Sequence, residues 1–235
     1  MENAEATPAG HLRRQPTQAR SRERVARILD AAAAIVDEDG SDALRVDEIA
    51  RRAEVPLGTL YQFFARKDDI VYALAERFAL RFGEVLEHQL AETPEGAGWK
   101  VLMANLFAAY TDLYRTEPAL RELWVGARLD PDFIRADHEQ NNPRFATAVA
   151  DRLAPVARVE DDELRLMILA TWEATQALFE AAFRADPAGD PEILQQAQLM
   201  SARYLAPAFE DAQGSSPSLP RSAATRLTKA KAQSR

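Results

Sequence analysis

Apolar positions recur at spacings of three and four along most of the chain, which is the period of an amphipathic helix. The clearest case lies between Thr17 and Gly40. Its apolar face collects Val25, Ile28, Leu29, Ala32, Ile35 and Val36. Gly40 follows three acidic residues and supplies the usual helix stop. No stretch shows the alternation of a strand, so the pattern predicts an all-α protein.

Two short helices are predicted directly after this first one, over residues 47–53 and 57–64. Only Glu54, Val55 and Pro56 separate them. Two short helices joined by so tight a turn are typical of a helix-turn-helix. Residues 17–66 are therefore predicted to form a three-helix domain.

The remainder of the chain is predicted to be a helical body over residues 67–211. Its amphipathic segments lie near 68–91, 99–115, 118–128, 131–153, 161–185 and 191–209. Asp190 can cap the last segment with Pro191 in its first position. Pro143 should bend or split the segment over 131–153. Residues 1–16 and 212–235 have the composition of a disordered arm and a disordered basic tail.

The net charge of −8 is unevenly distributed. Residues 11–27 carry six Arg against one Glu, and residues 212–235 carry five cations and no acid. For the basic tail, a contact with DNA and a merely solvated segment explain the charge equally well. The N-terminal cations run straight into the first helix, and they can follow a DNA backbone or enter a minor groove. The alternative is an arm that only raises nonspecific affinity.

Several classes of protein are disfavoured by the sequence. The absence of cysteine excludes disulfides and thiolate metal sites, and the apolar runs are too short to span a membrane. We expect a cytoplasmic protein. The three histidines are scattered, and neither a glycine-rich phosphate loop nor a Gly-x-Ser-x-Gly motif occurs. The sequence therefore predicts no catalysis, no metal site and no cofactor.

The segment 57–64 has the features that a DNA-reading helix needs. Such a helix enters the major groove and places its N-terminal residues at base edges. Thr59 and Gln62 lie three apart and can contact bases. Tyr61 offers a phenol to a phosphate, and Gly58 lets the backbone approach an anion. The alternative for Tyr61 is a partly buried aromatic that holds the small domain together.

Leu60 and Phe64, four residues apart, should face inward and hold this helix onto the first two. Lys67 stands at the start of the next helix, where a cation opposes the helix dipole by ~0.3–1 kcal/mol unless an anion compensates. A DNA phosphate is such an anion. Asp68 and Asp69 offset part of the cost, so an ordinary capped helix start is the alternative.

Residues 20–74 resemble the DNA-binding domain of the TetR (tetracycline-repressor-like) family. The resemblance is carried by Ile28-Leu29, Ile35-Val36, Asp39-Gly40, Val46-Asp47-Glu48-Ile49-Ala50, Gly58-Thr59-Leu60-Tyr61, Phe63-Phe64 and Lys67-Asp68. It covers about a quarter of the chain, and the family also has a long helical ligand-binding and dimerisation domain. The resemblance implies DNA contacts at Thr59, Tyr61, Gln62, Phe63 and Lys67, with the Gly58 backbone nearby.

Three positions depart from the family pattern. Pro56 and Arg45 stand where hydroxyl residues often cap helices, and Phe63 stands where His is commonest. Phe63 cannot donate a hydrogen bond, so it can only shield the helix or touch a thymine methyl. Arg45 is a hypothetical phosphate contact. The basic arm adds the candidate contacts Arg13, Arg14, Arg20, Arg22 and Arg24.

The body is expected to dimerise and to hold a ligand. The resemblance implies a four-helix bundle between subunits, made by the last two long helices; packing within one subunit is the alternative. A ligand cavity should be lined by aromatic residues with a few polar groups. Candidates are Trp99, Met103, Phe107, Tyr110, Trp124, Trp172 and Arg128, with His138 or Glu173 as further polar selectors. Plain core packing is the alternative for each aromatic.

Together these features predict a dimeric repressor that a small-molecule effector releases from a palindromic DNA operator. A transcriptional activator of the same fold is the first alternative. A helical protein-interaction module without specific DNA binding and a nonspecific DNA-coating protein are the others.

Overall fold

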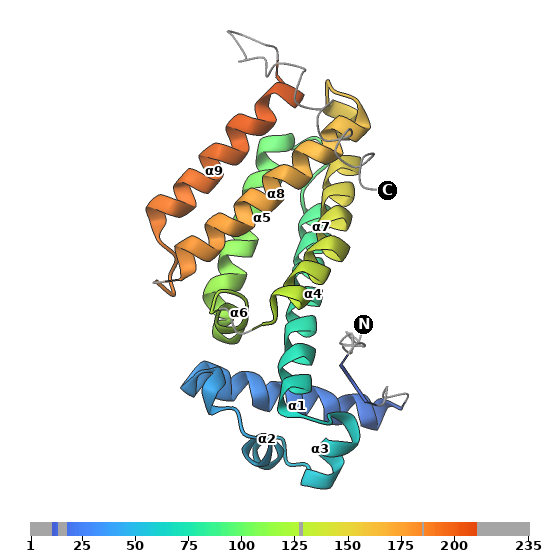
Figure 1. Cartoon of the computed structure of the whole chain (residues 1–235). Helices are drawn as coiled ribbons and strands as arrows, with labels where there is room; N and C mark the ends of the chain where they lie inside the picture. The colour runs from blue at the N-terminus through green and yellow to red at the C-terminus, as the bar shows by residue number, and fades with distance from the viewer. Residues whose placement is uncertain (1–10, 14–17, 127–128, 185, 211–235) are drawn as a thin grey trace, which may run out of the picture.

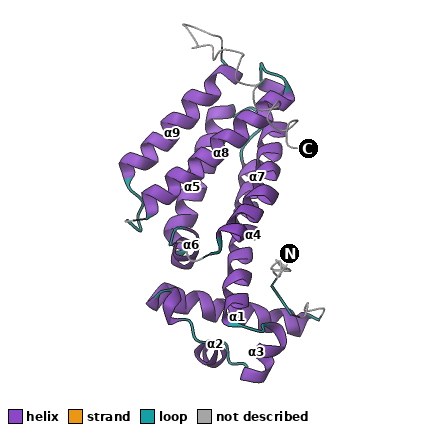
Figure 2. Ribbon diagram, viewed as in Figure 1, coloured by secondary structure: helices purple, strands orange, loops and turns teal. Residues whose placement is uncertain are grey.

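The computed structural model describes residues 11–13, 18–126, 129–184 and 186–210. Throughout these ranges the regular structure is helical, with no strand (Figure 2). The predicted all-α fold is confirmed. The predictions of disorder for residues 1–16 and 212–235 fall, except for 11–13, outside the described residues.

A small head is formed by three helices at one end of the molecule (Figure 1). They are α1 (Ala19–Asp39), α2 (Val46–Arg52) and α3 (Leu57–Phe63), with a 3-10 turn over Ser41–Ala43. The long helix α4 (Lys67–Glu92) leads from the head into the body. The helix-turn-helix predicted from the sequence is thus present.

The body is a bundle of helices beyond the head. It contains α5 (Trp99–Thr116), α6 (Pro118–Trp124), α7 (Pro131–Leu153), α8 (Asp161–Phe183) and α9 (Pro191–Leu205). Short 3-10 turns follow α7 and α9, over Ala154–Val156 and Ala206–Ala208. Helix α9 lies along one edge of the body with α8 beside it.

Two helices end earlier than expected. The segments predicted near 118–128 and 191–209 end as helices at Trp124 and Leu205. Of the bend or split expected at Pro143, the split is absent, and helix α7 runs continuously from Pro131 to Leu153. Its buried residues follow Asn141 and hold this half of the helix against the rest of the body, so packing outweighs the hydrogen bond that proline lacks. They are Asn142, Phe145, Ala146, Val149, Ala150 and Leu153.

The head is held together by the apolar face of α1. Ile28, Leu29 and Ile35 are fully buried there, and Ile49 of α2 and Leu60 of α3 are equally buried. Burial of each such side chain contributes about 1.5–3 kcal/mol relative to exposure. The position of α3 is thus set by the packing of its apolar side.

Three polar contacts fasten α1 to the body. Arg77 of α4 donates to Asp30 at 2.6 Å. Asp37 Oδ1 accepts from the backbone N–H of Ala119 at the start of α6, also at 2.6 Å. The Ser41 hydroxyl just after α1 donates to Glu122 of α6 at 2.9 Å. The orientation of the head is therefore tied to both α4 and α6.

Asp190 caps the start of α9, and its contribution to the stability of the fold can be measured. Asp190 Oδ1 accepts from the backbone N–H groups of Glu192 and Ile193 at 2.9 and 3.2 Å. Asp190→Ala is expected to lower the free energy of unfolding by about 1 kcal/mol because these two donors lose their acceptor. Asp190→Asn should keep most of the stability. Urea denaturation followed by circular dichroism measures both, and equal losses in the two variants would contradict the capping role.

Candidate DNA-binding surface and ligand cleft

The turn between α2 and α3 is short and well defined. The Val55 N–H donates to the Ala50 carbonyl at 3.0 Å, and the Val55 side chain is buried. Glu54 takes a positive φ of 53°. Pro56 then precedes the first residue of α3 with φ −59°. This geometry presents α3 on the outer surface of the head.

Helix α3 has a buried side and an exposed polar side. Leu60 and Phe63 face inward, and Phe64, directly after the helix, is 0% exposed. Gly58, Tyr61 and Gln62 are exposed, Tyr61 at 44%. Their spacing of three and four places them on one face, and they line a shallow surface hollow of about 480 Å³ together with Arg13.

The other predicted DNA contacts differ in their exposure to solvent. Thr59 is half-buried, whereas Lys67 is exposed at the start of α4. Phe63 is 5% exposed and packs in the core of the head, so its side chain is turned away from the surface that a duplex can reach. The reason is that Phe63 lies three residues after Leu60, on the same apolar side of the short helix.

The candidate contact at Arg45 lies exposed just before α2. Its Nε is 3.5 Å from Asp47 Oδ1. Both side chains are largely solvent-exposed, and an ion pair of this kind stabilises little. Arg20, Arg22 and Arg24 are also exposed, in the first two turns of α1.

Two further cations of the head are held by acidic neighbours. Arg51 and Arg52 both donate to Glu48, at 2.6–2.8 Å, and Arg52 also donates to Glu38 of α1 at 2.6 Å. Hydrogen bonds from Arg51 and Arg52 lower the pKa of Glu48 to about 2. Arg52 thus joins α2 to α1, whereas Arg51 pairs within α2. The exposed cations that these acids do not hold, around α1, α3 and the start of α4, are the candidates for contact with phosphate.

The start of α4 pairs Arg66 with an acidic residue of its own helix. Asp69 Oδ2 accepts from the backbone N–H groups of Ala65 and Arg66, both at 2.9 Å. The Arg66 guanidinium lies 3.6 Å from Asp69 Oδ1. Asp69 therefore caps the helix and pairs with Arg66. This is the geometry of an ordinary capped helix start, which was the alternative to a phosphate contact. Within the described residues, Lys67 has no such ion pair.

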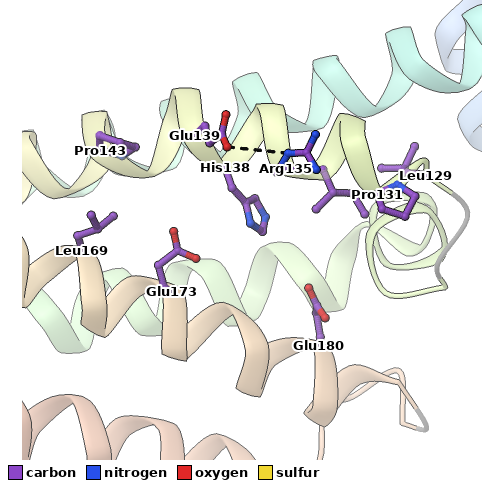
Figure 3. Close-up of a pocket in the computed structure, with 10 residues that line it drawn as sticks. Leu129, Pro131, Arg135, His138, Glu139, Pro143, Leu169, Glu173 and Glu180 are labelled. Atoms are coloured by element: carbon purple, nitrogen blue, oxygen red, sulfur yellow. Dashed lines mark ion pairs between the residues drawn. The ribbon is translucent and has the colours of Figure 1, made fainter. Parts of the chain in front are cut away.

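A cleft of about 820 Å³ opens between α7 and α8 in the body (Figure 3). Its apolar wall includes Leu129, Pro131, Ile134, Pro143 and Leu169. Its polar residues are Arg135, His138, Glu139, Glu173 and Glu180. Figure 3 shows His138 of α7 and Glu173 and Glu180 of α8 pointing into the space between the two helices. The volume suits a small organic molecule.

The charges in this cleft do not cancel. Arg135 lies 3.9 Å from Glu139 and 2.9 Å from Asp132, so acidic residues already surround it. Glu173 Oε1 accepts from the buried amide of Asn142 at 2.8 Å. Burial raises the pKa of Glu180, and His138 and Arg184 oppose that rise. The lining as a whole is acidic with apolar walls.

Most of the aromatic ligand candidates pack against each other instead of lining this cleft. Tyr110 is buried and donates to the Phe82 carbonyl at 3.0 Å, and burial raises its pKa. Trp172 stacks on Phe145 at 4.1 Å and donates to Asn142. Other pairs are Trp99 with Phe209, Phe107 with Phe179 and Trp124 with His138.

Two of the polar candidates, His138 and Glu173, do line the cleft. Met103 is half-buried against the core. Arg128 lies outside the described residues. The role of His138 and Glu173 as polar selectors of a ligand stays a prediction, and the apolar walls around them had no local signal in the sequence.

Among the described residues, no helix is long and apolar enough to cross a membrane, and no three acidic or histidine side chains are grouped so that they could hold a metal ion.

The head and the helical body define the class of a helix-turn-helix regulator of transcription. Residues 28–74 match the family described as "Bacterial regulatory proteins, tetR family", and residues 97–209 match "Tetracyclin repressor-like, C-terminal domain". A TetR-family transcriptional regulator from Streptomyces coelicolor is 34% identical, with a TM-score of 0.64, over 79% of this chain and 97% of that chain. This chain belongs to the TetR family. The family is one of DNA-binding transcription regulators, not of enzymes.

Curated relatives are repressors and regulators. The transcriptional repressor KstR of Rhodococcus jostii is 30% identical over 47% of this chain and 50% of its own length. The fatty acid metabolism regulator protein of Bacillus subtilis is 31% identical over 37% of this chain and 43% of its own length. The chain thus spans half the length, or less, of these curated relatives.

Proposed function

We propose that this DNA-binding regulator acts in the cytoplasm as a dimeric repressor, and that a small molecule in the α7–α8 cleft releases it from a palindromic operator. The observation that carries the proposal is the exposed face of α3, where Gly58, Tyr61 and Gln62 lie together opposite the buried Leu60 and Phe63. Residues 17–66 serve as the DNA-binding domain, and residues 67–211 serve as the ligand-binding and dimerisation domain.

Dimerisation is supported by the outer faces of α8 and α9. Leu166 of α8 is 65% exposed, and Leu199 and Tyr204 of α9 are also exposed. Ala170 and Ala177 continue the exposed side of α8 and allow close approach of another helix. One recognition helix reads few base pairs, whereas a two-fold dimer places two of them about 34–36 Å apart or a multiple of that.

A direct test combines light scattering with selection of bound duplexes from a random pool. The proposal expects a mass of two chains and a palindromic consensus with half-sites one helical turn apart or a multiple of it. Binding without sequence preference would favour the nonspecific DNA-coating protein instead. The proposed repressor also requires that operator binding lowers transcription of an adjacent reporter, whereas an increase would favour the activator.

The proposed effector site lies in contact with the elements that orient the head. Helix α7 packs against α4, which in turn packs against α1 and bonds to it through Arg77 and Asp30. A ligand shifts the balance between two head orientations only through its different affinity for them, commonly by ~1–3 kcal/mol. The acidic lining of the cleft favours an organic cation with an apolar part over an anion.

Filling the cleft should separate DNA binding from release. Leu169→Trp is expected to leave operator affinity within about twofold, because Leu169 belongs to α8 of the body and not to the head that carries α3, but to abolish release by any compound that acts on the wild type. Fluorescence anisotropy of labelled operator, titrated with arylalkyl amines and arylalkyl carboxylates of matched size, measures this. Leu80→Trp, on the exposed side of α4, is the control. Normal release from Leu169→Trp would place the effector elsewhere.

A further inference from the structure

The short segment 11–13 lies against the DNA-facing side of the head. The backbone N–H of Arg13 donates to the Phe63 carbonyl at the end of α3, at 2.8 Å. The exposed Arg13 side chain borders the hollow that Gly58, Tyr61 and Gln62 line. Within the described residues no ion pair holds its guanidinium. A cation is therefore fixed beside α3, although it is distant from α3 in sequence.

The other end of this segment is anchored between the head and the body. The His11 ring stacks on Tyr72 of α4, with centroids 4.7 Å apart and planes at 26°. Phe133 of α7 lies 5.7 Å from His11 and 5.0 Å from Tyr72. His11 Nε2 is also 3.6 Å from Glu76 Oε1 of α4. Leu12 packs against the apolar core between these two attachments.

Anchoring at both ends has a consequence for Arg13. A basic residue in an unattached arm loses much conformational entropy when it binds a phosphate. Here the hydrogen bond to α3 and the aromatic anchor at His11 have already ordered the backbone of the segment. The arginine guanidinium can donate two parallel hydrogen bonds to the oxygens of one phosphate. A guanidinium at this place is therefore suited to bind a phosphate of the DNA strand that borders the major groove.

We propose that Arg13 binds a DNA phosphate beside the bases that α3 reads, and that His11 is the residue that positions Arg13. This inference rests on the proposed reading of DNA by α3. It adds a contact that lies outside the three-helix head and depends on the body, because Phe133 belongs to α7. Pro131 and Ile134, on either side of Phe133 in the sequence, line the ligand cleft.

The first test is Arg13→Gln in the full chain, with binding to the selected operator measured at several salt concentrations. Loss of one phosphate contact removes about 0.9 from the salt slope, which corresponds to about eightfold weaker binding for each subunit at 0.1 M salt. The loss should be uniform across operator variants, and Arg13→Lys should retain part of the affinity. Arg144→Gln, on the exposed side of α7, removes the same charge and should change neither quantity.

The second test separates positioning from general structure. His11→Ala should reproduce part of the loss seen in Arg13→Gln, and His11→Phe should restore binding because the aromatic stack is kept. The double variant His11→Ala with Arg13→Gln should bind no more weakly than Arg13→Gln. Fully additive losses would overturn the positioning role of His11.

An unchanged salt slope in Arg13→Gln would overturn the phosphate contact. A loss confined to operators with A·T-rich flanks would also overturn it, in favour of a minor-groove contact. Gln62→Glu on α3 separates this inference from the proposed function. If Gln62→Glu loses binding while Arg13→Gln does not, only the inference fails; if Gln62→Glu also binds normally, the proposed function fails.

Discussion

Gln62→Glu is expected to weaken binding to the selected operator at least about 30-fold while leaving the fold unchanged. Gln62 is exposed on the same face of α3 as Tyr61 and Gly58, and no described residue depends on it for a hydrogen bond. The substitution replaces an amide that can donate with a carboxylate that cannot, and it brings negative charge toward phosphates. A bidentate base contact contributes about 1–3 kcal/mol of discrimination, and a dimer would lose two.

The matched control for this prediction is Gln140→Glu. Gln140 is exposed on α7 of the body and does not belong to the head that carries α3, so the same chemical change there should leave operator affinity within about twofold. Both proteins should give the same circular dichroism spectrum and melting midpoint as the wild type. Near-normal operator binding by Gln62→Glu would show that the exposed face of α3 does not read DNA.

The pattern of apolar residues was enough to predict nearly every helix, because helical periodicity is a local property. The continuity of α7 through Pro143 depends on long-range packing. Pro143 sits inside α7 although its own chemistry disfavours a helix interior, since buried residues such as Phe145 and Val149 hold the following turns in place. Whether a proline breaks a helix therefore cannot be judged from the neighbouring residues in the sequence alone.

The candidate DNA-binding face was predicted in part. The sequence paired Thr59 with Gln62 and gave Gly58 and Tyr61 separate roles, whereas the structure exposes Gly58, Tyr61 and Gln62 and leaves Thr59 half-buried. Phe63 shows the limit of this reasoning. The family resemblance implied a contact there, whereas the structure buries the side chain in the head.

The cleft between α7 and α8 and the attachment of residues 11–13 had no local signal in the sequence. A cavity is space that side chains leave empty, so its place depends on how α7 and α8 lie against each other. Aromatic content instead marked positions such as Tyr110 and Trp172, whose rings fill the core. The contact between Arg13 and the Phe63 carbonyl joins residues fifty positions apart, and no pattern within either segment indicates it.

Phe64→Ala is expected to lower the free energy of unfolding by about 3–5 kcal/mol. Phe64 is 0% exposed and closes the core between α3 and α1, so the substitution leaves a cavity as well as losing apolar contacts. Leu57, at the other end of α3, is 43% exposed. Leu57→Ala is the matched control and should cost less than about 1 kcal/mol. Urea denaturation at one fixed protein concentration gives both values, since dissociation of a dimer makes stability depend on concentration.

The same experiment shows whether head and body unfold together. All three tryptophans, Trp99, Trp124 and Trp172, lie in the body, so their fluorescence reports the body while circular dichroism reports every helix. One continuous apolar core extends from α1 to the end of the body. The bond from Ala119 to Asp37 fastens α6 to α1 as well. We therefore expect Phe64→Ala to shift the fluorescence and circular dichroism midpoints by the same amount. If helical signal were lost before tryptophan fluorescence changed, the head would be unfolding independently, and the contacts of α1 with α4 and α6 would be too weak to carry a change in the body to α3.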